Sequence, residues 1–527
     1  MLLSDLLKPV GIISSNTEKL NEKSIPIHKL AYHSSEVEEG TLFVCITGYR
    51  TDGHKFAEAA LLKGATALIV ERFLPELDIP QYKVENSRKA LAKISSVFFD
   101  RPSERMSVFG VTGTNGKTTI TYMTDCIFRA DKLETGLIGT VMIKNRDKKT
   151  PSVLTTPESL DLQGYLSDMQ TAGVSHVSME VSSSALELQR VADVDFDVVA
   201  FTNINKDHIE LHGSFDAYFS AKASLIRKAS SSSIAVINGD EPLLTSLVNE
   251  TEAQVVTFGI NNTEADVTVT DVQLLAGRPS FTVNINTPLT TLGGNTLAPI
   301  SFPVDLNVPG QHSMYNALTA IIVGLANDLS VSTVKSGIES FEGVERRFHI
   351  LYDEEFMIVD DLFLNENNIE SSMRTLESLT YQSIKIVHAI RGSNGSKLNR
   401  ENATKMAQWF RKLSIDKMVL TASRSHVKTK DQVSQEELNA FLDVMADFEI
   451  DVEYYDELEQ ALSSSLKKIE QGDLMLITGA RGMDYGAKTL LDLLKKNKPE
   501  SSRRIIQEVL NKKMVGMDDL SLTDSSA

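Results

Sequence analysis

Short apolar runs alternate with amphipathic stretches over most of the chain. Runs such as ATALIVE (65–71) and LMLITGA (474–480) are continuous and apolar, which is typical of strands buried on both faces of a parallel sheet. The stretches between such runs, for example HKFAEAALLKGA (54–65), have the composition of helices and carry a glycine near their end. The pattern predicts an α/β protein whose parallel sheets are covered by helices.

Two interruptions divide this pattern. DRPSER (100–105) is rich in turn-forming residues, and the alternation restarts after GVERRF (343–348). A chain of 527 residues is also long enough for several domains. We therefore predict a small N-terminal α/β domain, a central domain with a parallel sheet, a doubly wound Rossmann-like domain and a polar tail, at residues 1–103, 104–340, 341–496 and 497–527.

Strand predictions are strongest in the second and third domains. The central runs are SHVSMEVS (175–182), FDVVAFTNI (196–204) and SIAVING (233–239). A β-rich segment, 254–307, and an amphipathic helix within 308–328 follow them. The runs of the third domain are FMIVDD (356–361), IKIVHAI (384–390), DKMVLTAS (416–423) and LMLITGA (474–480). Ligands bind at the carboxyl ends of parallel strands, so residues directly after these runs are candidates for a site.

Composition narrows the possible functions. Lys plus Arg number 53 and Asp plus Glu number 71, a net charge of −18, which argues against non-specific nucleic-acid binding because that needs a basic surface. The two cysteines, Cys45 and Cys126, lack metal-site spacing, so a cytoplasmic, reducing location is expected. The N-terminus lacks the apolar core of a signal peptide, and no run of about 18 apolar residues predicts a membrane span.

The most specific motif is GVTGTNGKTT (110–119), which has the glycines and the lysine of a phosphate-binding loop. It lies between an apolar strand and a predicted helix, where backbone N–H groups at the helix N-terminus bind phosphate oxygens. Lys117 supplies a positive charge, and the Thr118 hydroxyl is suited to Mg²⁺. The motif predicts a P-loop ATPase-like domain that binds a nucleoside triphosphate.

Candidate metal ligands follow two of the central strands. Glu180 closes an apolar run, where a carboxylate is costly unless it is paired or bound to a metal. Asp207 and His208 follow the next run, with His212 nearby, and these residue types ligate divalent ions. Taken singly, Glu180 also fits a salt bridge, the Asp207–His208 pair fits an exposed surface, and Lys222 fits a solvated helix position.

In this order the motifs resemble the Mur ligase family, and its MurE type in particular. The resemblance rests on TGTNGKTT (112–119), TTPESL (155–160), MEVSSSAL (179–186), TNINKDHIELHG (202–213) and the AK pair at 221–222. Residues 35–71 also look like that type's uridine-binding domain. The family implies an ATP-dependent ligase that adds an amino acid to UDP-N-acetylmuramoyl-L-alanyl-D-glutamate in peptidoglycan precursor synthesis.

The resemblance also implies roles for the matched residues. The nucleotide-binding set is Gly113, Thr114, Asn115, Gly116, Lys117, Thr118, Thr119, Asn316 and Arg347. The Mg²⁺ set is Thr118, Glu180, His208 and Lys222, with Lys222 carried as a carbamate. The substrate set is Ser34, the GYRTDG loop (48–53), Thr155, Thr156, Ser182, Arg190 and, for the amino acid, Arg424. The set assigned to catalysis is Lys117, Lys222, His208 and Asp360.

The implied mechanism needs no nucleophilic side chain. The γ-phosphate of ATP transfers to a substrate carboxylate, the amine attacks the resulting acyl phosphate, and the tetrahedral intermediate collapses to an amide and phosphate. Mg²⁺ and Lys117 offset the charge of the transferring group. We expect the C-terminal domain to close over the nucleotide and exclude water, and the protein to act as a monomer.

The third domain departs from the family pattern. The family's D-Y-A-H-x-P, D-N-P-R and G-K-G-H-E stretches are replaced after Asp360 by DLFLNENN (361–368), and elsewhere by LTASRSHV (420–427) and GARGMD (479–484). In the central domain, Ser184 and Ser313 stand where the family usually has histidine and asparagine.

These departures leave three hypotheses open. The chain is a MurE-type ligase with a changed amino-acid preference, a paralogue that joins an amino acid to a different carboxylate in a specialised pathway, or a non-catalytic scaffold. Arg391 and Arg424 either bind a substrate carboxylate bidentately or are surface arginines. The scaffold is disfavoured because a protein without catalysis has no physical need to keep Lys117, Glu180 and Lys222 together.

Overall fold

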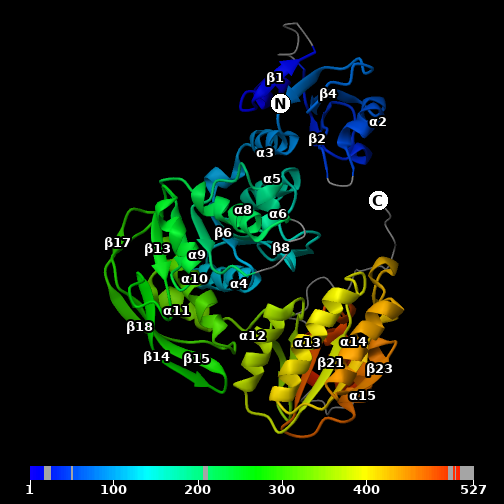
Figure 1. Cartoon of the computed structure of the whole chain (residues 1–527). Coiled ribbons are helices and arrows are strands. Elements are labelled where there is room, and N and C mark those ends of the chain that lie inside the picture. The colour runs from blue at the N-terminus through cyan, green and yellow to red at the C-terminus, as the bar shows by residue number, and fades with distance from the viewer. Residues whose placement is uncertain are drawn as a thin grey trace.

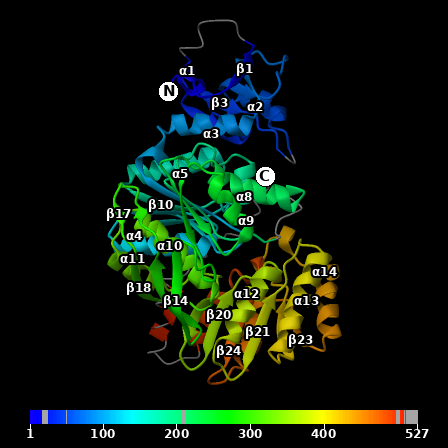
Figure 2. The same ribbon diagram turned by 60° about the vertical axis from the view of Figure 1, so that its left-hand side comes forward.

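The computed structural model describes residues 1–16, 25–48, 51–205 and 212–496, together with 503–504, 506–507 and 509–510. These residues form three α/β domains (Figure 1). The N-terminal and C-terminal domains pack on different sides of the central domain (Figure 2). The predicted fold class is therefore confirmed. Among the described residues, no helix has the length and apolar character needed to cross a membrane.

The N-terminal domain has a five-stranded sheet in the order β1-β5-β4-β3-β2. Its strands are β1 (Ile12–Ser15), β2 (Lys29–Ala31), β3 (Thr41–Val44), β4 (Ala65–Val70) and β5 (Gln81–Val84). β2 to β5 run parallel, and β1 pairs antiparallel with β5. The helices are α1 (Leu3–Leu7), α2 (Ala57–Leu62) and α3 (Ser87–Phe98). α3 packs against α5 (Ser159–Thr171) of the central domain.

The central sheet has the order β18-β15-β14-β13-β12-β11-β6-β10-β7-β8-β9. Its parallel core is β6 (Ser107–Thr112), β7 (Thr135–Ile138), β10 (His176–Glu180), β11 (Val198–Phe201), β12 (Ile234–Asn238) and β13 (Gln254–Phe258). The outer strands are β8 (Met142–Asn145), β9 (Lys148–Pro151), β14 (Val267–Leu275), β15 (Arg278–Ile285) and β18 (Ile300–Asp305), with a small pair, β16 (Leu289–Thr290) and β17 (Thr296–Leu297).

Helices cover both faces of the central sheet. α4 (Lys117–Ala130), α10 (His312–Ala326) and α11 (Val331–Glu339) bury one apolar cluster. The helices of the other cluster are α5, α6 (Ser183–Glu187), α8 (Phe215–Arg227) and α9 (Pro242–Thr245). Burial of the parallel strands on both faces explains their continuous apolar sequences.

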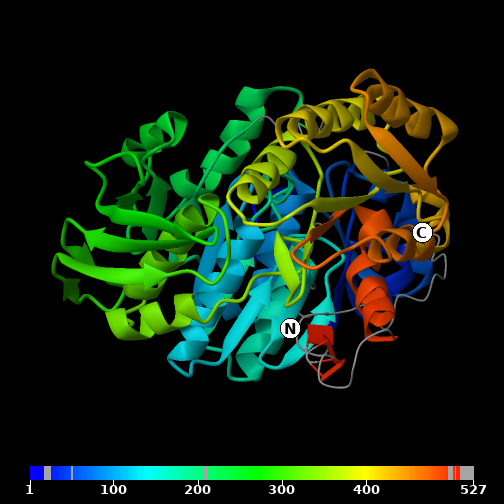
Figure 3. The ribbon, with the colours of Figure 1, turned by 90° about the horizontal axis from the view of Figure 1, so that it is seen from below.

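The C-terminal sheet has the order β19-β20-β24-β21-β22-β23 and is parallel except for β19. Its strands are β19 (His349–Asp353), β20 (Met357–Asp361), β21 (Ile384–Ala389), β22 (Lys417–Thr421), β23 (Asp451–Tyr455) and β24 (Leu474–Gly479). Helices α12 (Glu366–Glu377), α13 (Ser396–Lys412) and α14 (Gln435–Asp447) pack on one face, and α15 (Leu458–Leu466) and α16 (Gly486–Lys496) pack on the other (Figure 3). The sheet is thus doubly wound.

Candidate active site

The phosphate-binding loop connects β6 to α4 and has the geometry that its sequence predicts. Gly116 has φ +87°, and a Cβ there would lie 2.4 Å from Oδ1 of Asn316 on α10. Glycine suits this left-handed backbone, and its missing side chain lets Asn316 approach the loop closely beside the helix N-terminus. The Lys117 ammonium donates to the carbonyls of Gly113 (2.8 Å) and Thr114 (3.1 Å). Thr119 lies in the first turn of α4.

An asparagine that the sequence analysis did not single out supports this loop. Asn203 follows β11, and its amide group accepts from the backbone N–H of Asn115 and donates to the carbonyl of the same residue, both at 2.9 Å. The N–H of Thr114 donates to the Asn203 carbonyl at 3.1 Å. One side-chain amide therefore pairs with the loop as a neighbouring strand would. Its position directly after a buried strand was the available sequence signal.

Glu180 joins the loop to the neighbouring strand end. Its carboxylate is 1% exposed and accepts from the hydroxyls of Thr118 (3.0 Å) and Thr140 (3.1 Å) and from the Thr140 N–H (2.7 Å). A hydroxyl and a carboxylate within one hydrogen bond of each other are oxygen ligands of the kind that Mg²⁺ prefers. Three or more His, Cys, Asp or Glu side chains do not gather into a metal site among the described residues, but the predicted ligand His208 lies outside them.

Lys222 lies beneath the phosphate-binding loop rather than in solvent. It is carried by α8, which Ser214 caps, and it is 2% exposed. Its ammonium donates to the Gly113 carbonyl at 2.8 Å and lies 4.9 Å from the centre of the Tyr218 ring. The solvated-helix alternative is therefore wrong for this lysine. His212 contacts Glu187, with Nδ1 2.7 Å from Oε2.

The predicted muramoyl-peptide residues gather around Glu180. The Thr156 hydroxyl donates to the Glu180 carbonyl (2.7 Å) and accepts from the Ser182 N–H (3.1 Å). Arg190 donates to the Thr156 carbonyl at 3.1 Å, and the Thr155 hydroxyl lies 3.0 Å from that of Thr140. These residues therefore form one polar cluster beside the phosphate-binding loop.

The N-terminal domain reaches this cluster through an acidic residue. Glu158 pairs with Arg190 at 2.8 Å and with Arg88 of α3 at 3.0 Å. The predicted substrate residue Ser34 lies in a short 3-10 helix (Ser34–Glu36) of the N-terminal domain, where its backbone carbonyl accepts from Lys63. Tyr49 and Arg50 of the GYRTDG loop lie outside the described residues.

The C-terminal domain contacts the phosphate-binding loop directly. The Asn368 side chain, on α12, donates to Oδ1 of Asn115 at 2.8 Å, and Ser371 lies 3.2 Å from Nδ1 of His312. Arg347 is partly buried, and its desolvation lowers its pKa, while the carboxylates of Glu180 and Asp361 act in the opposite direction. Arg347 thus brings a positive charge toward the Glu180 side of the loop.

Asp360 is enclosed within the C-terminal domain. It is 1% exposed, and its Oδ1 lies 3.6 Å from Nε of Arg346. Burial raises the pKa of Asp360 to about 7 although Arg346 opposes the shift. The Arg346 guanidinium also donates to the Gly479 carbonyl, and the backbone of Arg346 has φ +61°. The sequence pattern carried no signal for this arginine.

The predicted carboxylate-binding arginines lie in different environments. Arg424 is 58% exposed and pairs with Asp456 at 3.1 Å. The following Ser425 and His426 line a surface groove of about 670 Å³ whose lining residues all belong to the C-terminal domain. Burial lowers the pKa of Arg391, and the neighbouring Arg481 lowers it further.

Comparisons with known proteins agree with this architecture. Three family models match: "Mur ligase family, catalytic domain" at 26–99, "Mur ligase middle domain" at 111–324 and "Mur ligase, glutamate ligase domain" at 346–481. A Halalkalibacterium halodurans relative, a UDP-N-acetylmuramoyl-L-alanyl-D-glutamate–2,6-diaminopimelate ligase, is 31% identical over 90% of this chain and 94% of its own length. The chain belongs to the Mur ligase family. A ligase of the same description from Bacillus velezensis is 32% identical over 86% of this chain and 89% of its own.

Solved structures support the fold of this Mur ligase. One, of a UDP-N-acetylmuramoyl-L-alanyl-D-glutamate–2,6-diaminopimelate ligase, has a TM-score of 0.64 and 22% identity, and the match covers 90% of this chain and 92% of the other. The MurF ligase of Thermotoga maritima, solved with ADP, has a TM-score of 0.60 and 20% identity over 93% and 99% of the two chains. Mur ligases are ATP-dependent enzymes that use Mg²⁺, so the prediction of such a ligase is confirmed.

Proposed function

We propose that this Mur ligase adds an amino acid to UDP-N-acetylmuramoyl-L-alanyl-D-glutamate with conversion of ATP to ADP and phosphate through an acyl phosphate, as a cytoplasmic monomer in peptidoglycan precursor synthesis. The observation that carries the proposal is the position of Glu180. The Glu180 carboxylate accepts from Thr118 of the phosphate-binding loop, and the backbone carbonyl of Glu180 accepts from Thr156 of the polar cluster. A phosphate donor on the loop and a carboxylate acceptor on the cluster would then be neighbours.

Each group of residues in the site has a separate role in the proposed reaction. Lys117 and the loop N–H groups hold the ATP phosphates. Thr118 and Glu180 would hold Mg²⁺, which neutralises phosphate charge when bound. Thr155, Thr156, Ser182 and Arg190 orient the substrate carboxylate, so that a bimolecular reaction proceeds within one bound complex. The contact of Asn368 with Asn115 supports a role for the C-terminal domain in excluding water.

Lys222 is proposed to act as a carbamate. Carbamylation replaces a buried cation by an anion, which suits a metal site better than an ammonium does. Protein loaded with ¹³C-bicarbonate should give a carbamate resonance that is absent from Lys222→Ala. Absence of the resonance from the active wild type would exclude the modification.

The added amino acid is a separate question. The relatives are named for 2,6-diaminopimelate, but here Arg424 stands in the replaced D-N-P-R stretch and pairs with Asp456. This observation favours a changed amino-acid preference, and a ligase that uses a different carboxylate acceptor remains the second candidate. The deciding assay is phosphate release with ATP, Mg²⁺, the UDP-muramoyl dipeptide and a panel of amino acids that includes lysine and diaminopimelate. Release that needs both the dipeptide and one amino acid supports the proposal, whereas silence with ATP still bound refutes it.

A further inference from the structure

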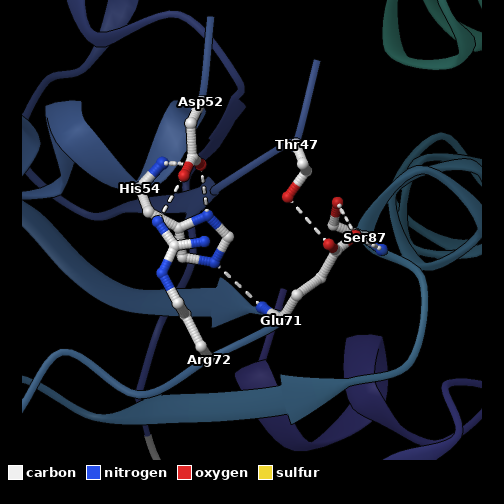
Figure 4. A network of polar contacts seen from close by, with 6 residues as sticks. All are labelled: Thr47, Asp52, His54, Glu71, Arg72 and Ser87. Atoms are coloured by element: carbon white, nitrogen blue, oxygen red, sulfur yellow. Dashed lines mark hydrogen bonds and ion pairs between the residues drawn. The ribbon is translucent and has the colours of Figure 1, made fainter. Parts of the chain in front are cut away.

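A buried histidine links the carboxylate of Asp52 to the backbone of Glu71 at the carboxyl edge of the N-terminal sheet (Figure 4). The His54 side chain is 0% exposed. Its Nδ1 lies 2.7 Å from Oδ1 of Asp52, and its Nε2 accepts from the backbone N–H of Glu71 at 3.0 Å. Since Nε2 accepts a hydrogen bond, it carries no proton. The ring is therefore neutral, and its one N–H donates from Nδ1 to Asp52.

Asp52 fixes the described part of the loop between β3 and α2. Its carboxylate caps a short 3-10 helix (Gly53–Phe56) by accepting from the His54 N–H at 3.0 Å, and it also contacts Arg72. Its backbone pairs with Thr47 across the loop, and the Gly53 N–H donates to the Ile46 carbonyl at 2.8 Å. The position of Asp52 thus decides how the two arms of this loop approach each other.

Glu71 anchors the other side of the network. Its carboxylate accepts from the N–H (2.9 Å) and the hydroxyl (2.8 Å) of Ser87 at the start of α3, and from the Thr47 hydroxyl at 2.7 Å. Glu71 directly follows β4. The histidine ring therefore connects the loop after β3 to the end of β4, and through Glu71 to the start of α3.

We propose that His54 is a positioning residue for the UDP end of the substrate, acting through Asp52 and without touching the ligand. The inference rests on the proposed function, whose UDP-linked substrate the sequence resemblance assigns to this loop. Parallel sheets bind ligands at this edge, and the described arms of the loop offer backbone groups there. His54 sets their geometry because Asp52 accepts from both its backbone and its ring.

Two substitutions separate positioning from mere stability, because each keeps one of the two ring contacts. Asparagine carries its amide near the place of Nδ1 and keeps a donor for Asp52. Glutamine carries its amide near the place of Nε2 and keeps an acceptor for the Glu71 N–H. His54→Gln should raise the KM for the UDP-muramoyl dipeptide about tenfold, with kcat and the KM for ATP unchanged, as expected when uniform substrate binding is lost.

His54→Asn should behave in the opposite way. It leaves the buried Glu71 N–H without an acceptor, so it should melt at least about 4 °C lower than His54→Gln while its KM stays within about threefold of wild type. Titration calorimetry with UDP as the probe should show the same order, with weaker UDP binding in His54→Gln and near wild-type binding in His54→Asn. His176→Asn, at the amino end of β10 in the central sheet and so outside the N-terminal domain, is the control and should leave this KM unchanged.

The outcomes separate the two proposals. If KM follows the melting temperature across the variants, or if His54→Gln has the wild-type KM, His54 has only a structural role and the inference is overturned. If wild-type protein neither binds UDP nor turns over the dipeptide, the proposed function fails first and this inference fails with it.

Discussion

Asp360→Asn tests the energetics of the buried charge in the C-terminal domain. The substitution keeps the shape of the side chain and removes its titration. Burial raises the pKa of Asp360 from 3.8 to about 7, although Arg346 opposes the shift. Between these two values the folded protein keeps a proton on Asp360 that the unfolded chain releases. The contribution of Asp360 to stability is therefore fully present below about pH 4 and is lost as the pH rises through about 7.

The size of the effect follows from this difference in pKa. About three pKa units at about 1.4 kcal/mol each give about 4 kcal/mol. Wild-type protein should lose this amount relative to Asp360→Asn between pH 4 and pH 8. The loss of the Arg346 contact in the variant adds an offset that does not depend on pH, so the change in the stability difference with pH isolates the titration.

Trp409 makes the measurement specific to the right domain. It is the one tryptophan of the chain, and it lies in the C-terminal core at 6% exposure. Urea unfolding followed by its fluorescence at pH 4 to 8 reports on this domain. Its hydrogen-bond partner, Glu370, has a pKa of about 2 and does not titrate in this range. Parallel pH profiles for wild type and variant would refute the assignment of a raised pKa to Asp360.

Three further predictions concern the nucleotide side. Gly116→Ala places a Cβ 2.4 Å from Oδ1 of Asn316 in a left-handed backbone, so calorimetry should show ATP affinity reduced at least about tenfold, with about 1–2 kcal/mol of strain; wild-type affinity would contradict the close approach. Lys117→Ala should lower kcat for phosphate release by about 100-fold or more because the positive charge that stabilises the transferring phosphoryl group is lost. If the protein were a non-catalytic scaffold, this substitution would leave its phenotype unchanged. Glu180→Gln keeps the contact with Thr118 but removes the charge, so the Mg²⁺ concentration for half-maximal activity should rise about tenfold; an unchanged Mg²⁺ dependence would exclude Glu180 as a ligand.

Buried strands could be predicted from the sequence because strands that are buried on both faces have continuous apolar runs. SIAVING became β12 and LMLITGA became β24. The strand β8 was missed because MIKN contains Lys144, which is 6% exposed and pairs with Asp125 at 2.5 Å. The edge strand β23 was also missed, since DVEYY is only partly buried. Neither strand therefore has the continuous apolar run that the prediction relied on.

The nucleotide side was predictable for a different reason. A phosphate-binding loop depends on local backbone geometry, and Gly116 and Lys117 report that geometry within a few residues. Asn203 was missed because its role depends on pairing with Asn115, which is 88 residues away. Whether His208 reaches the same site stays a prediction, as do the roles assigned to Lys222 and Asn316.

The amino-acid site expected in the C-terminal domain is hard to predict from the sequence. Contacts between residues far apart in the chain decide which of its charged side chains are paired or buried. Arg424 follows a strand as Arg347 precedes one, yet Arg424 pairs with Asp456 at the surface, whereas Arg347 is partly buried and the Glu180 carboxylate acts on its pKa. Arg346, with no motif at all, lies in a left-handed backbone against Asp360. A non-glycine residue in that conformation carries strain that the surrounding contacts must offset. The identity of the added amino acid therefore depends on which charged side chains of the C-terminal domain it can pair with, and this is a property of the folded domain rather than of any one motif.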